Sequence, residues 1–357
     1  MNRNHSDHPA ALTGRRPGRV GSSPSLVFGI AIVLCAFLVP GCGGVEHENV
    51  SFAVTPDGRS VVFSAADGDL YRLTLEMNRV SRLTSTAETE SMPTVSPDGK
   101  DVVYAGTIKG RQGTCLFSRS LDGTGEARQL TNVTGVSDSS PAVSPDGNRI
   151  AFLRARTHRS RSTGGWAWAD FDVYVIGRDG SNPLRVTTKN FVQVNGLTFA
   201  EGGDRLVVAG NVNGPSWRMV LFTVPTDGSK QPERFAPPVA PDPESVVWGG
   251  GPSASHDTRR MALISDRIKS YNYDVFVMKS DGTDARPLGV ARMSRYNQNP
   301  VILPGGKSVL FLAGADEGGS PRPVFSLWRV GIDGSDPRRV AGSGLFSDPL
   351  HWQPPAD

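Results

Sequence analysis

The chain has little cysteine, little histidine and no large excess of charge of either sign. Its 357 residues include three Cys and six His, and 38 Lys and Arg stand against 35 Asp and Glu. So small an excess of basic residues gives no support for nucleic-acid binding. The sequence also lacks the Gly-x-Ser-x-Gly, His-Glu-x-x-His and Cys-x-x-Cys motifs. These absences exclude the nucleophile elbow of a serine hydrolase, the zincin zinc site and a paired-cysteine redox centre.

Polar and apolar residues are separated at the N-terminus. Residues 1–24 are polar and basic, and residues 25–39 are almost wholly apolar. A basic segment followed by an apolar run that is short for a membrane span is typical of a signal peptide. A Pro-Gly-Cys sequence ending at Cys42 follows, and it resembles a bacterial lipobox. We therefore predict a lipoprotein signal peptide over 1–41, lipidation of Cys42 and a short membrane-proximal linker over 42–48. An ordinary secretory signal cleaved nearby is the alternative.

The few cysteines fit this interpretation. Cys35 lies inside the predicted signal peptide and Cys42 is assigned to the lipid, which leaves Cys115 as the thiol of the mature chain. One thiol cannot form an intramolecular disulfide, even in an oxidising compartment. Cys115 is therefore interpreted as a small buried apolar residue.

One turn motif recurs through residues 49–357. Its clearest form is Ser/Thr-Pro-Asp-Gly, in which Pro presets φ, Asp bonds its own backbone and Gly supplies a positive φ. The clear copies are Pro56-Asp57-Gly58, Pro97-Asp98-Gly99 and Pro145-Asp146-Gly147. Weaker copies lie at 200–203, 255–258 and 303–306, of which the second lacks both Pro and Gly and is assigned from its flanking residues. The backbone bond explains the Asp, so a calcium site is not predicted.

Each turn introduces the same series of strand patterns. Ile150–Leu153 reads as a second strand and Val173–Ile176 as a third, and in five of six copies an Asp-Gly turn follows the third strand. A short fourth strand then closes the unit. Six such units of roughly 40 to 56 residues predict an all-β fold, a six-bladed β-propeller of four-stranded antiparallel blades. A generic sandwich is the alternative, although sandwiches do not normally repeat one four-strand signature.

The predicted blades share a simple order along the chain. They span 49–84, 90–131, 138–187, 192–236, 244–289 and 296–341. The tail over 348–354 resembles another first strand. It could close the ring by pairing with the first blade, cap an exposed edge, or belong to a less favoured seventh blade.

These residues also carry a resemblance to a known family. Ser-Pro-Asp-Gly-x-x-Ile-Ala-Phe, followed by Asp-Val-Tyr-Val, Asp-Gly and Arg-x-Leu-Thr, is similar to the WD-type propeller repeat of the TolB family, over about residues 50–341. The resemblance implies a periplasmic protein that binds the lipoprotein Pal and other Tol components. The chain departs from the family because nothing helical fits between Cys42 and the first blade, and because it carries its own lipid signal. We therefore assign it to the repeat family and not to the Tol-Pal system.

A propeller of this kind has tight turns on one face and longer connections on the other. The longer connections are where a binding function can be added. The longest, over 154–171, is rich in Arg and Trp, which are common at protein interfaces. An alternative is a solvated insertion whose tryptophans pack back on the third blade. The candidate binding face comprises Arg154, Arg156, Arg159, Arg161, Trp166, Trp168, Trp217, Arg218, Arg267, Lys269 and Tyr271.

No catalytic residue, metal site or cofactor is predicted. The histidines do not cluster on this topology, which weakens a polysaccharide lyase resembling oligogalacturonate lyase, whose channel metal is held by histidine. We therefore predict a non-catalytic, lipid-anchored propeller that faces the periplasm or cell surface and binds an envelope protein of unknown identity. A polysaccharide-binding or lyase-type propeller is the alternative. A receptor for a small molecule in the channel rests on fold analogy alone.

Overall fold

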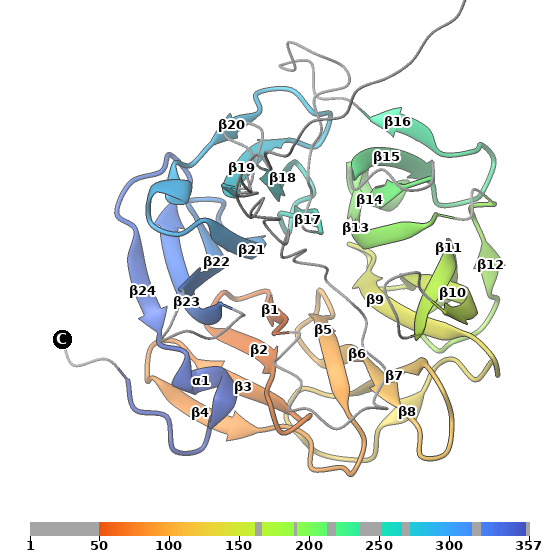
Figure 1. Ribbon diagram of the computed structural model, residues 1–357, viewed down its shortest axis with the longest axis horizontal. Helices are drawn as coiled ribbons and strands as arrows, with labels where there is room; N and C mark the ends of the chain where they lie inside the picture. The colour runs from red at the N-terminus through yellow and green to blue at the C-terminus, as the bar shows by residue number, and fades with distance from the viewer. Residues whose placement is uncertain are drawn as a thin grey trace, which may run out of the picture. The chain divides into compact units, whose positions relative to one another are not determined.

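The computed structural model describes residues 50–160, 166–188, 191–212, 219–235, 251–265, 272–315 and 323–354. Within these ranges, 24 strands form six four-stranded antiparallel sheets. The sheets are arranged as blades around a ring, with the first strand of each blade nearest the axis (Figure 1). The predicted six-bladed all-β propeller is therefore confirmed.

The first three blades follow one another without exchange of strands. Blade 1 contains β1 (Phe52–Val54), β2 (Ser60–Ser64), β3 (Leu70–Thr74) and β4 (Arg79–Arg82). Blade 2 contains β5 (Glu90–Val95), β6 (Asp101–Thr107), β7 (Thr114–Ser120) and β8 (Arg128–Gln129). Blade 3 contains β9 (Ser137–Val143), β10 (Arg149–Ser160), β11 (Trp166–Gly177) and β12 (Leu184–Arg185).

The last three blades repeat the arrangement. Blade 4 contains β13 (Gln193–Ala200), the 3-10 turn η1 (Glu201–Gly203), β14 (Arg205–Asn211), β15 (Val220–Pro225) and β16 (Glu233–Phe235). Blade 5 contains β17 (Ser253–Ala254), β18 (Arg260–Ser265), β19 (Asp274–Lys279) and β20 (Arg286–Pro287), and η2 (Val290–Arg292) follows it. Blade 6 contains β21 (Tyr296–Ile302), β22 (Ser308–Ala315), β23 (Val324–Gly331) and β24 (Arg338–Ala341).

The turn between the first and second strands has the hydrogen bonds and the backbone geometry that its Ser/Thr, Asp and Gly residues favour. In blade 1, Thr55 Oγ1 donates to Asp57 Oδ1 over 2.5 Å, and the amide of Arg59 donates to the same oxygen over 3.0 Å. Gly58 has a φ of 71°. The bonds from hydroxyl to carboxylate recur at Ser96–Asp98, Ser144–Asp146 and Ser255–Asp257. Each aspartate side chain therefore accepts a hydrogen bond from the backbone of its own turn, as predicted. The same bonds form in the copy at 255–258, which lacks Pro and Gly.

A second set of side-chain hydrogen bonds and ion pairs joins the start of the third strand to the end of the fourth strand and the residues after it. In blade 1, Arg82 bonds Asp69, and Thr84 Oγ1 both accepts from the amide of Leu70 and contacts Asp69 Oδ1. Blade 3 repeats it with Arg185 and Thr187 on Asp172. We call this Asp–Arg–Thr set the strand clamp. The sequence analysis identified the strands but not this role.

The first strands contact one another around the axis. The amide of Met92 donates to Ser51 Oγ over 2.9 Å, the amide of Ser140 donates to Met92 Sδ over 3.3 Å, and Asn299 Nδ2 donates to the carbonyl of Val50 over 2.8 Å. Met92, Ser140 and Asn299 each precede a proline, have φ near +50° and lie at shifts in strand register. These β-bulges bring one blade's backbone to the next.

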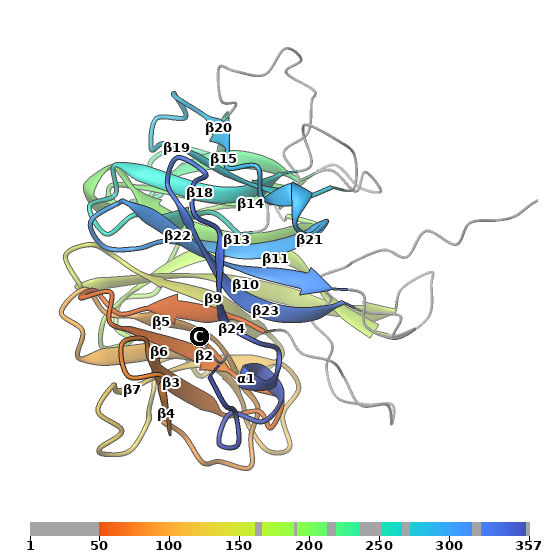
Figure 2. The ribbon, with the colours of Figure 1, turned by 90° about the vertical axis from the view of Figure 1, so that its left-hand side faces the viewer.

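The ring closes by packing of blade 6 on blade 1. One apolar cluster contains Phe63 and Tyr71 of blade 1, Leu312 of blade 6, and Leu345 and Phe346. The last two lie in the short helix α1 (Gly344–Ser347), which sits beside blade 1 (Figure 2). The tail over 348–354 contains no strand, so the expectation of another first strand there is wrong. Helix α1 buries apolar side chains at the junction, and this takes the place of strand exchange.

Candidate functional site

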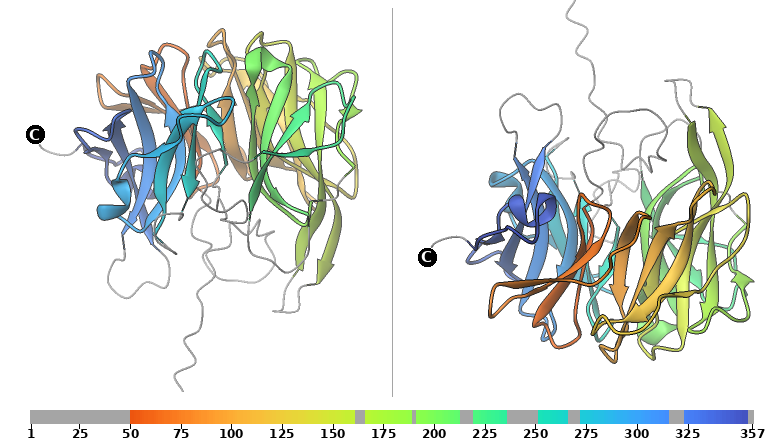
Figure 3. Two further views of the ribbon diagram at one scale, coloured as in Figure 1. Left: turned by 90° about the horizontal axis from the view of Figure 1, so that it is seen from above. Right: turned by 90° about the horizontal axis from the view of Figure 1, so that it is seen from below.

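The longest hairpin of the described chain is formed by β10 and β11 in blade 3. Its register runs from Arg149 opposite Gly177 to Ser160 opposite Trp166. The hairpin projects beyond its neighbours on the face of the second-to-third connections (Figure 3). The predicted loop over 154–171 is therefore mostly strand. The sequence analysis ended the strands too early because it interpreted their arginines and tryptophans as loop composition.

Arg154 is part of the hairpin's base. Its Nε and Nη2 atoms donate to the two carboxylate oxygens of Asp138 over 2.6 and 2.8 Å, and its guanidinium lies 4.7 Å from the ring centre of Tyr174. Burial works against the charged form, but Asp138 outweighs it and raises the pKa of Arg154. Both residues are buried. Arg154 therefore holds β10 to β9.

Arg156 lies one step further along the hairpin, on the strand clamp of the same blade. Its Nη2 atom is 3.2 Å from Asp172 Oδ2, the oxygen that Arg185 Nη2 also contacts at 2.6 Å. The Asp172 side chain is fully buried, whereas the two arginine side chains are about one-third exposed. A buried carboxylate between two cations is stabilised by both. Arg156 thus joins the hairpin to the clamp.

Trp168 packs inward towards blade 2. Its side chain is buried, and its ring centre lies 4.9 Å from that of His158. A Cβ at Gly113 would lie 2.9 Å from the Trp168 indole and 2.5 Å from the carbonyl oxygen of Val136. Because Gly113 also has a φ of 83°, a glycine at this position permits the close contact. Trp168 therefore fixes the hairpin to the preceding blade and offers no exposed stacking face.

For the remaining candidate residues, the structure gives either a strand position alone or no description. Arg159 and Trp166 are placed as strand positions at the far end of the hairpin. The candidates outside the described residues are Arg161, Trp217, Arg218, Arg267, Lys269 and Tyr271, together with the predicted lipid-bearing Cys42. The structure thus brings Arg154, Arg156 and Trp168 together in the base of one hairpin.

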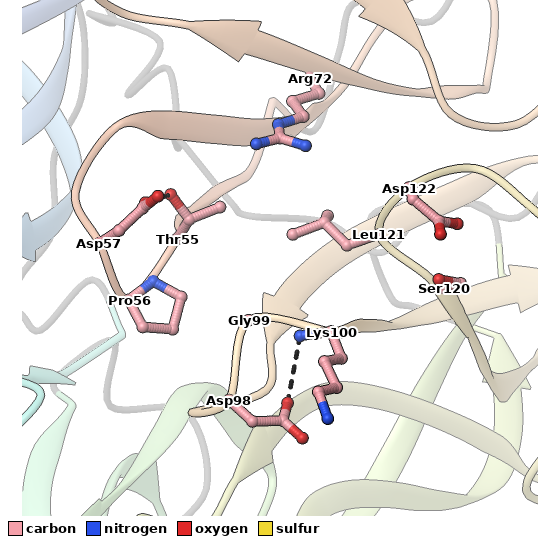
Figure 4. A pocket seen from close by; sticks show the side chains of 10 residues that line it. All are labelled: Thr55, Pro56, Asp57, Arg72, Asp98, Gly99, Lys100, Ser120, Leu121 and Asp122. Atoms are coloured by element: carbon pink, nitrogen blue, oxygen red, sulfur yellow. Dashed lines mark hydrogen bonds between the residues drawn. The ribbon is translucent and has the colours of Figure 1, made fainter.

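The tight-turn face holds a feature that the sequence analysis missed. An open recess of about 540 Å³ lies between blades 1 and 2 (Figure 4). Charged side chains of both signs surround it. Its lining comprises Thr55, Pro56, Asp57, Arg72, Asp98, Gly99, Lys100, Ser120, Leu121 and Asp122.

The carboxylates of this recess are held ionised by the turns. The Ser96 hydroxyl lowers the pKa of Asp98 to about 2, and the Thr124 hydroxyl does the same for Asp122. The Thr55 hydroxyl lowers the pKa of Asp57. Among the described residues, no group of three or more His, Cys, Asp or Glu is arranged to hold a metal ion. The helices of the described ranges include none long and apolar enough to cross a membrane.

Comparison with known proteins points to one repeat type. No family model matches the chain. "Tol-Pal system protein TolB" from Francisella tularensis strains is 31% identical over 96 residues, which cover 27% of this chain. The match spans about a fifth (19%) of the length of these curated relatives.

Solved structures extend the likeness to the ring. Putative TolB from Agrobacterium tumefaciens has a TM-score of 0.53 at 17% identity, covering 72% of this chain and 86% of its own. TolB from Acinetobacter baumannii has a TM-score of 0.53 at 15% identity, and the match covers 80% of this chain and 61% of that protein. The tricorn protease has a TM-score of 0.56 at 15% identity, and the match covers 86% of this chain and 27% of that protein. At sequence identities this low, the likeness shows a shared fold and not a shared function. The tricorn protease, an enzyme, has the same type of fold. From its repeats and its ring, the chain is a TolB-like six-bladed β-propeller.

Proposed function

We propose that the chain is a non-catalytic protein-interaction module of the bacterial cell envelope, exported and anchored by a lipid on Cys42. The likeness of its repeats to those of a Tol-Pal system protein supports an envelope role. The basic and apolar segments before Cys42 support export and lipidation. The partner is an envelope protein with acidic groups on the surface that meets the hairpin.

The observation that carries the proposal is the construction of the β10–β11 hairpin. Its base is fixed by the Arg154–Asp138 pair, by Arg156 on Asp172, and by Trp168 against Gly113. A projecting element with a fixed base loses little conformational entropy when a partner binds its far end. In the sequence, Arg159, Arg161 and Trp166 stand where β10 ends and β11 begins, and Arg and Trp often dominate binding energy at interfaces.

A pull-down from detergent-solubilised envelopes tests this role. The native chain is compared with the triple variant Arg159→Ala, Arg161→Ala and Trp166→Ala, which leaves the ion pairs of the base intact. The matched control, Arg338→Ala with Arg339→Ala, removes two exposed positive charges from β24 on another blade. A protein captured by the native chain and the control, but lost from the triple variant at unchanged melting temperature, supports the proposal. Equal capture by all three chains contradicts it.

A polysaccharide ligand is the alternative for the same hairpin. The burial of Trp168 removes one of the two tryptophans that could stack on a sugar, and Trp166 is left for that role. Binding of the native chain to purified cell-wall polysaccharide, lost on Trp166→Ala alone and kept in the Arg159→Ala and Arg161→Ala variant, would favour this alternative over a protein partner.

A further inference from the structure

The first described residues enter the propeller at one particular face. Val50 and Ser51 precede β1, so they lie at the end of the first blade that is opposite its tight first-to-second turn. This is the face of the second-to-third connections, on which the β10–β11 hairpin projects (Figure 3). We call it the long-connection face, and the tight-turn face lies at the other end of the strands.

The entry point is fixed to the ring near its axis. Val50 is 4% exposed, and its carbonyl accepts from Asn299 Nδ2 of blade 6 over 2.8 Å. Ser51 Oγ accepts from the amide of Met92 in blade 2 over 2.9 Å, and the amide of Ser51 donates to Ser64 Oγ over 3.2 Å. Contacts with the blades on both sides therefore hold the start of β1 in place. A tether attached before Val50 leaves the ring near its axis, at the long-connection face.

The proposed lipid anchor is close to this entry point along the chain. Eight positions separate Cys42 from Val50, and a chain of that length reaches at most about 28 Å when fully extended. The eight-residue strand β22 is itself about 26 Å long, and crossing a blade from its first to its fourth strand adds about 14 Å. The tether is therefore too short to pass around a blade to the tight-turn face. A bilayer that held the lipid would meet either the long-connection face or the outer edge of the ring.

Basic side chains in blade 2 favour the long-connection face. Lys109 is exposed in the loop between β6 and β7 and, among the described residues, makes no ion pair. Arg111 in the same loop donates to Asn132 Oδ1 over 2.7 Å and to the carbonyl of Val133 over 3.1 Å, both of which are neutral groups. Val133 is 45% exposed, so an apolar side chain accompanies the two cations. Basic and apolar side chains together suit the headgroup region of an anionic membrane.

A second basic pair lies across the ring from the first. Arg292 and Arg295 are exposed in the connection between blades 5 and 6, which belongs to the same face. Blades 2 and 5 lie opposite each other in a ring of six, so cations on both sides can reach one flat surface (Figure 1). Asp67 and Glu88 are acids of this face in and after blade 1, and Asp67 lies 3.6 Å from Arg82 Nη2. The two basic pairs are thus separated from these acids along the ring.

We propose that the long-connection face lies on the bilayer that holds the lipid of Cys42, an anchor that itself belongs to the proposed function. The two basic pairs, on opposite sides of the ring, contact anionic phospholipid headgroups. The tight-turn face, with the recess between blades 1 and 2, points away from the membrane. A protein that binds the β10–β11 hairpin then meets it at the membrane surface, which restricts the partner to proteins held in or on the same membrane.

Thiol labelling of the lipidated chain tests this orientation in vesicles of phosphatidylethanolamine and phosphatidylglycerol. Gln112→Cys places a reporter on the long-connection face, and Glu126→Cys places one at the other end of the same blade. The chain without a reporter gives the background of Cys115, which is buried. A polyethylene-glycol maleimide is too large to enter between protein and bilayer. We expect it to label Gln112→Cys at least about five-fold more slowly than Glu126→Cys, and the difference to disappear in detergent.

Charge removal then identifies what holds this face on the membrane. Lys109→Gln with Arg292→Gln removes one cation from each pair and should speed labelling of Gln112→Cys at least about three-fold, because each cation near an anionic surface adds to binding. Lys100→Gln with Lys307→Gln removes two exposed cations of the tight-turn face and is the matched control, which should change nothing. Vesicles of phosphatidylcholine alone should also speed the labelling.

Four other results would contradict the proposal. Equal labelling of Gln112→Cys and Glu126→Cys on vesicles means that the chain is anchored without resting on this face, and it leaves the proposed function intact. Protection in native membranes that is absent from vesicles of pure lipid means that a protein covers the face. Protection that neither the double variant nor neutral lipid reduces overturns the headgroup contacts. A chain recovered without lipid contradicts the anchor of the proposed function, and the orientation with it.

Discussion

At the scale of single residues, Glu90 is a buried carboxylate without a cation opposite it. It is 4% exposed, and Thr86 Oγ1 donates to its Oε1 over 3.2 Å. Its Oε2 has no partner among the described residues. In blade 3 the equivalent acid, Asp138, has Arg154 across the strand, whereas Glu90 has Gly106. Burial therefore raises the pKa of Glu90. The protonated form is favoured in the fold, so the contribution of Glu90 to stability is present at low pH and lost as pH rises through the raised pKa.

Glu90→Gln removes this pH-dependent loss. We expect the variant to be more stable than the native chain at pH 7, by on the order of 1 kcal/mol, and close to it at pH 4. Urea unfolding at the two pH values measures the difference, and Glu76→Gln, at an exposed acid, is the control that should change neither. A loss of stability at pH 7 that disappears at pH 4 would show that the ionised carboxylate is needed, and would contradict the expectation.

The buried pair of Arg154 and Asp138 gives a second expectation at this scale. Arg154→Ala leaves the Asp138 carboxylate buried without its cation, so we expect a loss of about 3–5 kcal/mol in the free energy of unfolding. Replacing both residues, by Arg154→Met and Asp138→Leu, should restore most of the lost free energy of unfolding, because no uncompensated charge remains. Chemical denaturation of the two variants measures this. A loss below about 1 kcal/mol for Arg154→Ala would mean that the pair is not needed at the hairpin's base.

At the scale of elements, the strand clamp varies in blade 2. Cys115 is buried and stands where blades 1 and 3 have Asp69 and Asp172, and Gln129 stands where they have arginine. The threonine is kept, because Thr131 Oγ1 accepts from the amide of Leu116, and Gln129 Nε2 donates to the Thr131 carbonyl as Arg82 Nε does to Thr84. Burial raises the pKa of the Cys115 thiol, which stays neutral. Blade 2 thus keeps the geometry of the clamp without its ion pair.

Restoring the ion pair should show coupling between the two positions. Cys115→Asp alone buries a carboxylate without its cation and should destabilise the chain. Adding Gln129→Arg should recover at least about 1 kcal/mol beyond the sum of the single effects, as residues in contact do. A double-mutant cycle in urea measures the coupling. Additive single effects would show that the charged pair contributes little to a blade beyond the threonine bond.

The same elements show how far the sequence could predict the structure. The tight turns were predictable because Pro, Asp and Gly impose their backbone geometry locally. The extension of the β10–β11 hairpin was not, because Arg154 becomes a strand residue through Asp138, 16 residues away. The clamp and the recess were missed for a related reason. Asp172 and Thr187 lie 15 residues apart, and the recess is lined by residues of two blades, from Thr55 to Asp122.

At the scale of the whole molecule, the proposed anchor has a direct test. Cys42→Ser removes the thiol that lipidation requires. We expect the variant to lose incorporation of labelled palmitate and to move from the membrane fraction to the soluble fraction, while Cys115→Ser, at a buried strand position, keeps both properties. Membrane association that survives Cys42→Ser would mean that another part of the chain holds it there.

Closure of the ring depends on side-chain packing, because each blade is one continuous segment and, in the part of the chain that the structure describes, no strand passes from blade 1 to blade 6. Phe346 is 1% exposed, its ring meets that of Phe63 edge-on at 5.4 Å, and its carbonyl accepts from the amide of Ala66. Phe346→Ala leaves a cavity at the junction, and we expect a loss of about 3–5 kcal/mol in the free energy of unfolding. Leu350→Ala, exposed in the same tail, should change it by less than about 0.5 kcal/mol.

The size of the Phe346→Ala effect then identifies what closes the ring. A large loss, measured by urea unfolding, means that the first and last blades need α1 to stay together. A loss below about 1 kcal/mol means that blade 6 and blade 1 close the ring through their own strands, and that α1 only covers an apolar edge. Truncation after Ala341 separates these further. If α1 closes the ring, the truncated chain should unfold at least as easily as Phe346→Ala, because it lacks Leu345 as well.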